Sequence, residues 1–296
     1  MNAVPQPKPC LGPIDEASTP NRAFPPGTWD THFHVFGPLD RFPYAPDRKY
    51  TPPPAPLDAY VALAERLGIA RGVCVHPNVH GPDNDVTLDA LRRADGRLLG
   101  IIKASERLSL AQLREWDGGG VRGVRFAFNP QHGGELDTAL LDRFASWAEE
   151  LRWCIDLHMA PEDLEPLVPR LSTLTVPLVI DHFARIDPAQ GLDQRPFRVL
   201  FDLVRRDHVF VKLSGADRIS RTGPPYGDVV PFARQLIAAA PTRVLWGTDW
   251  PHSGYFDPNR MPRDAVLADL VFEMAPREAD RTRLLVDNPK RLFERR

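Results

Sequence analysis

The alternation of short apolar runs with longer helical patterns, which begins at Thr28, constrains the fold more than any other feature. Eight runs rich in β-branched and other apolar residues have the length of buried strands. They cover residues 28–35, 71–76, 98–104, 121–128, 153–158, 178–182, 208–214 and 243–249. Segments with helical periodicity lie between them, for example residues 57–68, 135–152 and 229–240. Eight strands alternating with helices over about 260 residues are typical of a (β/α)8 barrel.

An open, doubly wound α/β sheet is the main alternative to this barrel. Such a sheet usually carries a glycine-rich phosphate turn directly after its first strand. The corresponding stretch here, HVFGPLD (residues 34–40), has no such pattern. We therefore predict an α/β protein with a (β/α)8 (TIM) barrel.

Proline is unusually abundant, with 32 residues among 296, and it is concentrated near the N-terminus. Residues 1–27 have no hydrophobic period and are interpreted as a proline-rich, extended N-terminal arm. Residues 28–296 are interpreted as a single barrel domain. Proline restricts the backbone of the loop at residues 42–56 (FPYAPDRKYTPPPAP), which we expect to fold across the barrel mouth. Whether the arm packs on the mouth, on another subunit or on neither is left open.

The composition excludes several classes of partner. The formal net charge is -2, without runs of one sign, so neither a nucleic acid nor an anionic membrane is an expected partner. No apolar stretch approaches the roughly 18 residues that span a bilayer, and the N-terminus lacks an apolar signal core. Three scattered cysteines favour a reducing, cytoplasmic location over a disulfide framework. The residues do not decide between a monomer and a homo-oligomer.

The first predicted strand carries two histidines near its carboxyl end. In the stretch TWDTHFHV, strict alternation would place Trp29 and Phe33 on one face and Asp30, His32 and His34 on the other. The carboxyl ends of barrel strands carry the active site. An alternating pair of imidazoles at that position therefore indicates a functional site.

Other predicted strands end in similar groups. The fifth ends in His158, the sixth in Asp181 and His182, and the eighth in Asp249. Imidazole and carboxylate groups bind a mononuclear divalent ion, which lowers the pKa of bound water to about 7. Without a metal, the carboxylate could act as general base while the imidazoles polarise a carbonyl oxygen. Both interpretations predict hydrolysis, and they differ in the cofactor.

These motifs resemble the amidohydrolase superfamily. The segments DTHFHVFGP, FPYAPDRKYTP, HGPDN, GVRGVRF, VIDH, DRISRTGPP and WGTDWPH are similar to those of one branch within it. That branch contains 2-pyrone-4,6-dicarboxylate lactonase and related sulfomuconolactone and sugar-acid lactonases. The resemblance covers roughly residues 28–295, and the motifs occur in the family's order.

The resemblance implies a role for each matching residue. His32, His34 and His182 would hold or polarise the lactone carbonyl. Asp249 would take a proton from the attacking water and pass it to the leaving oxygen. Arg125, Arg218 and Tyr50 match positions that bind substrate carboxylates in the pyrone lactonase. Asn78, in the loop after the second predicted strand, is a further candidate for contact with substrate. A guanidinium suits a carboxylate because it donates two parallel hydrogen bonds. Arg125 has a second interpretation, as an ion-pair residue of the barrel interior.

Three departures from the pyrone lactonase bear on substrate and cofactor. Gln131 stands where that enzyme has a second arginine, Asn78 where it has serine, and His158 where it has tyrosine. The pyrone lactonase works without metal, whereas metal-dependent relatives have a histidine on the fifth strand. We therefore predict one divalent ion, zinc, and metal-free catalysis is the alternative. The predicted ligands are His32, His34, His158 and Asp249.

The predicted function is the hydrolysis of a small anionic lactone: a muconolactone, a pyrone carboxylate or a sugar-acid lactone. The alternative is a metal-dependent decarboxylase of an aromatic or muconate-type acid. A barrel that binds its ligand without catalysis is a further alternative. The family's bridging lysine would lie on the fourth strand, which has none, so Lys103 and Lys212 do not indicate a binuclear site.

Overall fold

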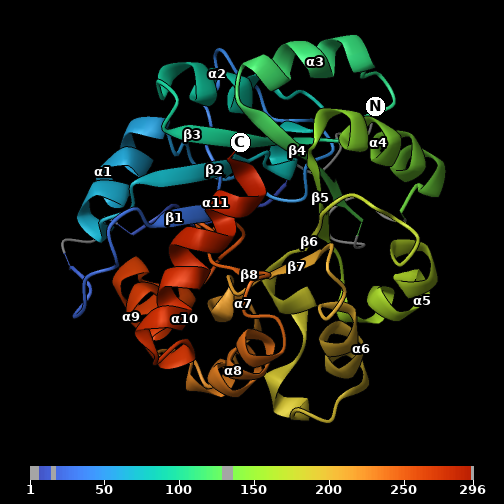
Figure 1. The fold of residues 1–296 in the computed structure, drawn as a ribbon. Helices are drawn as coiled ribbons and strands as arrows, with labels where there is room; N and C mark the ends of the chain where they lie inside the picture. The colour runs from blue at the N-terminus through green and yellow to red at the C-terminus, as the bar shows by residue number, and fades with distance from the viewer. Residues whose placement is uncertain (1–6, 15–17, 129–135, 295–296) are drawn as a thin grey trace.

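The computed structural model describes residues 7–14, 18–128 and 136–294. Eight parallel strands follow one another in chain order and curl into a barrel with helices around it (Figure 1). The strands are β1 (Trp29–Phe33), β2 (Arg71–Val75), β3 (Leu98–Lys103), β4 (Val121–Ala127), β5 (Cys154–His158), β6 (Leu178–Ile180), β7 (Val209–Lys212) and β8 (Val244–Leu245). The predicted (β/α)8 barrel is thereby confirmed.

Helices connect the strands and cover the outside of the barrel. They are α1 (Leu57–Leu67), α2 (Asp85–Arg93), α3 (Leu110–Gly118), α4 (Thr138–Leu151), α5 (Pro161–Leu171), α6 (Arg195–Leu203), α7 (Ala216–Ile219), α8 (Val230–Ala239), α9 (Asp264–Met274), α10 (Glu278–Thr282) and α11 (Asn288–Phe293). Local sequence sets several boundaries. Ser109 and Gln112 form a capping box at α3, and Gly68 ends α1 with φ +73°. In the part of the chain that is described, no helix is long and apolar enough to cross a membrane.

Backbone hydrogen bonds between β1 and the segment after β8 close the barrel. Thr31 N–H donates to the Trp246 carbonyl at 2.9 Å, and Asp249 N–H donates to the His32 carbonyl at 2.8 Å. Asp249 itself has φ +61° and lies beyond the end of β8. The last two predicted strand segments are therefore shorter than expected, because the backbone leaves the ladder where polar side chains turn into the barrel mouth.

The barrel interior is apolar at the end opposite the mouth. Trp29 stacks on Phe293 of α11 there, with ring centroids 6.4 Å apart. The same cluster contains buried side chains from the other strands: Val73, Val75, Leu99, Ile101, Cys154, Val179, Phe210 and Leu245. In Figure 1, α11 lies across this end of the barrel.

The predicted alternation along β1 is wrong in its first half. Trp29 packs in the interior, whereas Phe33 stacks on Tyr60 of α1, with ring centroids 3.4 Å apart. The Asp30 carboxylate also faces outward and accepts a hydrogen bond from Tyr60 Oη at 3.2 Å. An irregularity in the β1–β2 register between Asp30 and Phe33 shifts the alternation by one residue. His32 therefore points into the barrel although Asp30 does not.

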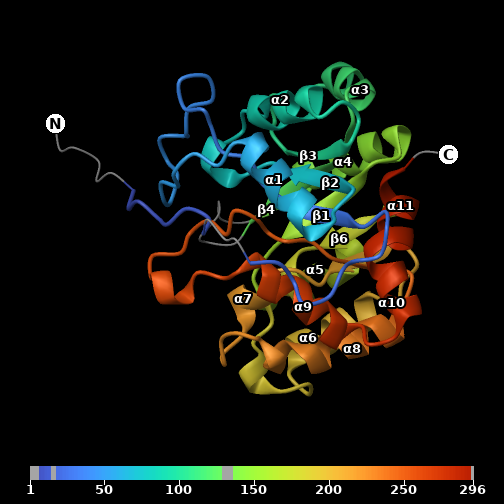
Figure 2. The same cartoon turned by 90° about the vertical axis from the view of Figure 1, so that its left-hand side faces the viewer.

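The described part of the N-terminal arm packs along the barrel (Figure 2). Near the mouth, Cys10 N–H donates to the Thr51 carbonyl at 2.9 Å, and Leu11 N–H donates to the Tyr255 carbonyl at 2.8 Å. Farther along, Asn21 N–H donates to the Asp269 carboxylate on α9 at 2.8 Å. The arm thus contacts both the loop after β1 and the loop after β8.

Candidate active site

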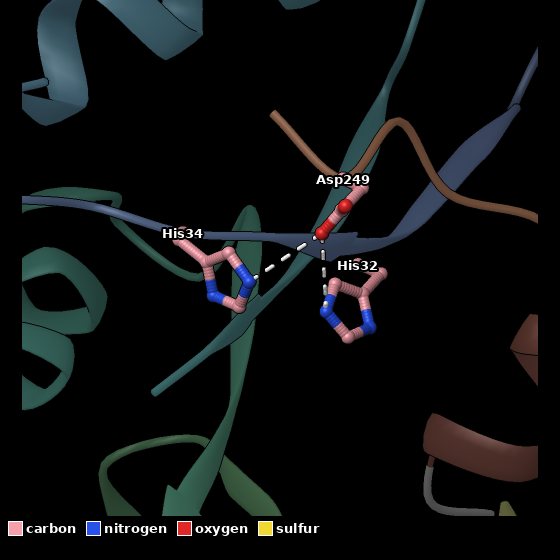
Figure 3. Close-up of side chains that lie close together, drawn as sticks. All are labelled: His32, His34 and Asp249. Atoms are coloured by element: carbon pink, nitrogen blue, oxygen red, sulfur yellow. Dashed lines mark ion pairs between the residues drawn. The ribbon is translucent and has the colours of Figure 1, made fainter. Parts of the chain in front are cut away.

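Three imidazoles surround one oxygen of Asp249 at the carboxyl ends of the strands. The Oδ1 atom lies 3.7 Å from His32 Nε2, 3.5 Å from His34 Nε2 and 3.8 Å from His182 Nε2. Figure 3 shows the first two rings directed at the carboxylate. All four side chains are buried. The structure therefore brings together the four residues that the sequence predicted as catalytic.

The other ring nitrogen of each histidine has a partner that fixes the ring. His34 Nδ1–H donates to the Val75 carbonyl at 2.7 Å, which directs Nε2 at Asp249. His182 Nδ1 shares a hydrogen bond of 2.9 Å with the Ser214 hydroxyl. Burial lowers the pKa of His182 to about 4, and burial holds the pKa of His32 well below its ordinary value despite nearby Asp181. His32 and His182 are therefore neutral near pH 7.

Arg218 anchors the second oxygen of Asp249. Its Nε donates to Oδ2 at 2.9 Å, and its Nη1 donates to the Ser253 carbonyl at 2.8 Å. Burial alone would raise the pKa of Asp249, but the Arg218 guanidinium and the neighbouring imidazoles hold it well below its ordinary value. Asp249 is consequently a carboxylate across the neutral range.

A cavity of about 500 Å³ lies above this cluster. Its size suits a small organic molecule. Eight of the nine residues that the sequence predicted for the site line it: His34, Tyr50, Asn78, Arg125, His158, His182, Arg218 and Asp249. His32, the ninth, is fully buried next to Asp249. The loop after β1 contributes Tyr50, whose hydroxyl bonds the Ser253 hydroxyl at 2.7 Å.

The predicted substrate-binding residues differ in the contacts that their side chains already make within the protein. Arg125 donates to Asp181 Oδ2 at 2.8 Å and lies 3.4 Å from Asp156, so it forms the interior ion pairs of its second interpretation, and it also lines the cavity. Asn78 Oδ1 is buried without a hydrogen-bond partner among the described residues. Gln131 lies outside the described residues.

Sequence reasoning missed Lys49 and Arg185, which line the same cavity. Lys49 precedes Tyr50, and this adjacency was the available signal. Arg185 reaches the cavity through a turn in which His182, Phe183, Ala184 and Arg185 all have φ between +50° and +57°. Left-handed backbone costs about 1 kcal/mol or more for each such residue and is concentrated at functional sites. A pattern of apolar periodicity contains no signal for this turn.

The donor set and its spacing fit a divalent metal ion. Ligand atoms of His32, His34 and Asp249 all lie within 4.8 Å of one another. Ligands bound tetrahedrally at the usual distances would lie about 3.4 Å apart, close to the separations seen here. His32 Nε2 is buried and has no hydrogen-bond partner in the described part of the chain. His158, the fourth predicted ligand, is not in this group, and its ring centroid lies 5.6 Å from that of His182.

Comparison with known proteins gives the family. A model of the amidohydrolase family matches residues 29–295. The chain belongs to the amidohydrolase family.

Two curated relatives are similar to the chain over nearly its whole length. The 4-sulfomuconolactone hydrolase of Hydrogenophaga intermedia is 58% identical over 285 residues, 96% of this chain and 94% of that one. The 2-pyrone-4,6-dicarboxylate hydrolase of Comamonas testosteroni is 38% identical, covering 93% of each chain. An apo crystal structure from Agrobacterium tumefaciens superposes with a TM-score of 0.82 at 31% identity, over 94% of this chain and 99% of that one. The predicted class, a lactone-opening hydrolase of this family, is confirmed.

Proposed function

We propose that this protein hydrolyses a muconolactone that bears sulfonate or carboxylate groups, with one zinc ion in the site. The observation that carries the proposal is the convergence of three imidazoles on Asp249 beneath a cationic cavity. Sulfomuconolactone is the substrate in the name of a relative with 58% identity. The substitutions at Asn78 and His158 separate this chain from the pyrone lactonase pattern.

The cavity has the charge that an anionic lactone requires. Among the described residues lining it, the cationic side chains are Lys49, Arg125, Arg185 and Arg218, and Asp249 is the single carboxylate. Arg125 and Arg218 are already paired with carboxylates, whereas no ion pair joins Lys49 or Arg185 to a described residue. Lys49 and Arg185 are therefore the best candidates to bind sulfonate or carboxylate groups, because an anion there meets cations without a counter-charge.

We propose His32, His34 and Asp249 as the metal ligands, with His158 as the fourth candidate. Imidazole and carboxylate are the ligands that zinc prefers in catalytic sites. A bound zinc ion would lower the pKa of water and polarise the ring carbonyl. This chemistry complements Asp249, because a carboxylate with a depressed pKa is by itself a weak base toward water.

Asp249 supplies the proton transfers in the proposed reaction. Its Oδ1 takes a proton from water while the water oxygen bonds to the lactone carbonyl carbon. The bond between that carbon and the ring oxygen then breaks, and Asp249 returns the proton to the ring oxygen, which leaves as a hydroxyl. Arg218 keeps Oδ2 fixed throughout, so that Oδ1 presents its lone pairs to the cavity.

The proposal is tested with a panel of sulfomuconolactone, muconolactone, pyrone carboxylates and sugar lactones, each assayed with and without added zinc or manganese. Asp249→Asn protein serves as the background control. We expect ring opening of an anionic muconolactone that increases with zinc and is abolished by chelation. Release of carbon dioxide would instead indicate a decarboxylase, and binding without turnover would indicate a non-catalytic barrel.

A further inference from the structure

Lys212 is a charged residue in the middle of the barrel interior that the proposed reaction does not use. It is fully buried on β7. Phe210, two residues earlier on the same strand, belongs to the apolar interior cluster, and Ser214, two residues later, bonds His182. Lys212 therefore lies between the apolar floor of the barrel and the site above it.

The Lys212 ammonium contacts two buried carboxylates and one histidine. It donates to Asp156 Oδ2, lies 3.0 Å from Asp181 Oδ1, and lies 3.0 Å from His32 Nδ1. Arg125 pairs with the same two carboxylates from the side of the cavity. Two cations and two anions thus form a balanced, buried layer directly below the site.

This layer reaches the site through the His32 ring. Asp181 Oδ1 lies 3.2 Å from Nδ1, and Lys212 Nζ lies 3.0 Å from that same oxygen, while Nε2 on the opposite side of the ring is directed at Asp249. Since Nε2 can bind a metal ion only when Nδ1 carries the proton, Nδ1–H donates to Asp181, and the Lys212 ammonium donates to the carboxylates. The bond to Asp181 orients the ring, and Lys212 holds the Asp181 oxygen that accepts this bond, so both residues determine where Nε2 points. Partners of this kind behind a metal-binding histidine commonly control its orientation.

Charge burial is costly, and apolar side chains fill the barrel one layer below without that cost. The charged layer occurs instead at the level of the barrel where it contacts the His32 ring. We propose that Lys212 is a positioning residue that, with Asp181, holds His32 so that Nε2 faces Asp249 and a bound ion. The inference rests on the proposed function for the metal, whereas the ring orientation can be measured independently of it.

The test separates positioning of His32 from charge balance. Lys212→Met removes the ammonium with little change in volume, and Lys212→Met with Asp156→Asn also removes one carboxylate and so restores neutrality. Lys103→Met is the matched control. Lys103 is half-buried at the end of β3, and its ammonium has no hydrogen bond or ion pair within the described residues.

Three measurements apply to each protein: the midpoint of thermal unfolding, zinc affinity by competition with a chromogenic chelator, and the His32 ring position in a crystal structure. We expect the double variant to unfold near the wild-type temperature, to bind zinc about 10- to 100-fold more weakly, and to show a rotated His32 ring. We expect a lower kcat and little change in KM. Lys103→Met should match the wild type.

Wild-type zinc affinity and an unmoved ring in the double variant would overturn the inference. A wild-type crystal structure in which Lys212 Nζ lies beyond hydrogen-bond distance of Asp181 Oδ1 would overturn it too, even if neither Lys212 variant folds. If wild-type protein binds no zinc and opens no lactone, the proposed function fails. The role of Lys212 is then judged from the His32 ring position alone.

Discussion

Arg218 and Asp249 form a buried ion pair in which Nε donates to Oδ2 at 2.9 Å. The two carboxylate oxygens therefore have different surroundings, because Oδ1 faces the imidazoles while Oδ2 is held. Arg218 also donates to the Ser253 carbonyl, which ties the carboxylate to the loop that follows β8.

Asp249→Asn should lower kcat by about 10²- to 10⁴-fold, since the amide cannot accept a proton from water. Binding of an anionic lactone should persist because the cavity keeps its cations. Steady-state kinetics and calorimetric titration with the active lactone measure the two effects. Turnover at the wild-type rate would refute the assignment of Asp249 as the base.

Arg218→Gln should move the acidic limb of the pH–rate profile to higher pH. Arg218 helps to hold the pKa of Asp249 low, so its removal raises that pKa. The carboxylate then becomes protonated earlier as the solution is acidified, and activity is lost at a higher pH. Arg221→Gln, an exposed arginine paired with Asp187, should leave the profile unchanged. An unshifted limb in the Arg218 variant would contradict the pairing.

Protein purified without chelators should contain one divalent ion per chain, and His34→Ala should lose most of it. The reason is that His34 offers one of the three proposed ligand atoms, the others being on His32 and Asp249. Metal analysis by mass spectrometry checks this. His208→Gln, a substitution far from the cluster at a histidine that contacts the Leu171 carbonyl, is the control. Metal-free protein with full activity in EDTA would exclude the ion.

Gly247→Ala should destabilise the protein by about 1–3 kcal/mol and lower activity, because overpacking displaces the backbone. An added Cβ would lie 2.6 Å from the His32 backbone nitrogen. Gly118→Ala is the matched control, since a Cβ there meets no heavy atom within 4 Å. Chemical denaturation measures both variants. Equal stabilities would show that β1 accommodates the methyl group.

Deletion of residues 1–11 should raise KM more than it lowers kcat. Residues 8–11 hydrogen-bond the Thr51 and Tyr255 backbones, next to Tyr50 and Ser253 of the cavity wall. Deletion of residues 1–6 alone keeps these contacts and serves as the control. Identical kinetics in both truncations would mean that the arm does not shape the site.

Much of the site could be predicted from the sequence because histidine and aspartate residues end or follow the predicted strands. His158, His182 and Asp249 could be found because they end or follow apolar runs of the sequence, and the carboxyl ends of barrel strands meet at one face. Lys49 and Arg185 could not be found in this way. A loop positions Lys49 and a left-handed turn positions Arg185, and no periodic pattern of apolar residues predicts those backbone conformations.

The barrel, the family and the candidate site residues could all be predicted from the sequence by itself. The reason is that alternating periodicity and local motifs depend only on residues that are close together in the chain. Only the tertiary structure decided which groups pair. The irregularity in β1 turned Asp30 outward and His32 inward, and Lys212 met Asp156, Asp181 and His32 from separate strands. Such pairings depend on register and barrel closure, which join residues far apart in the chain.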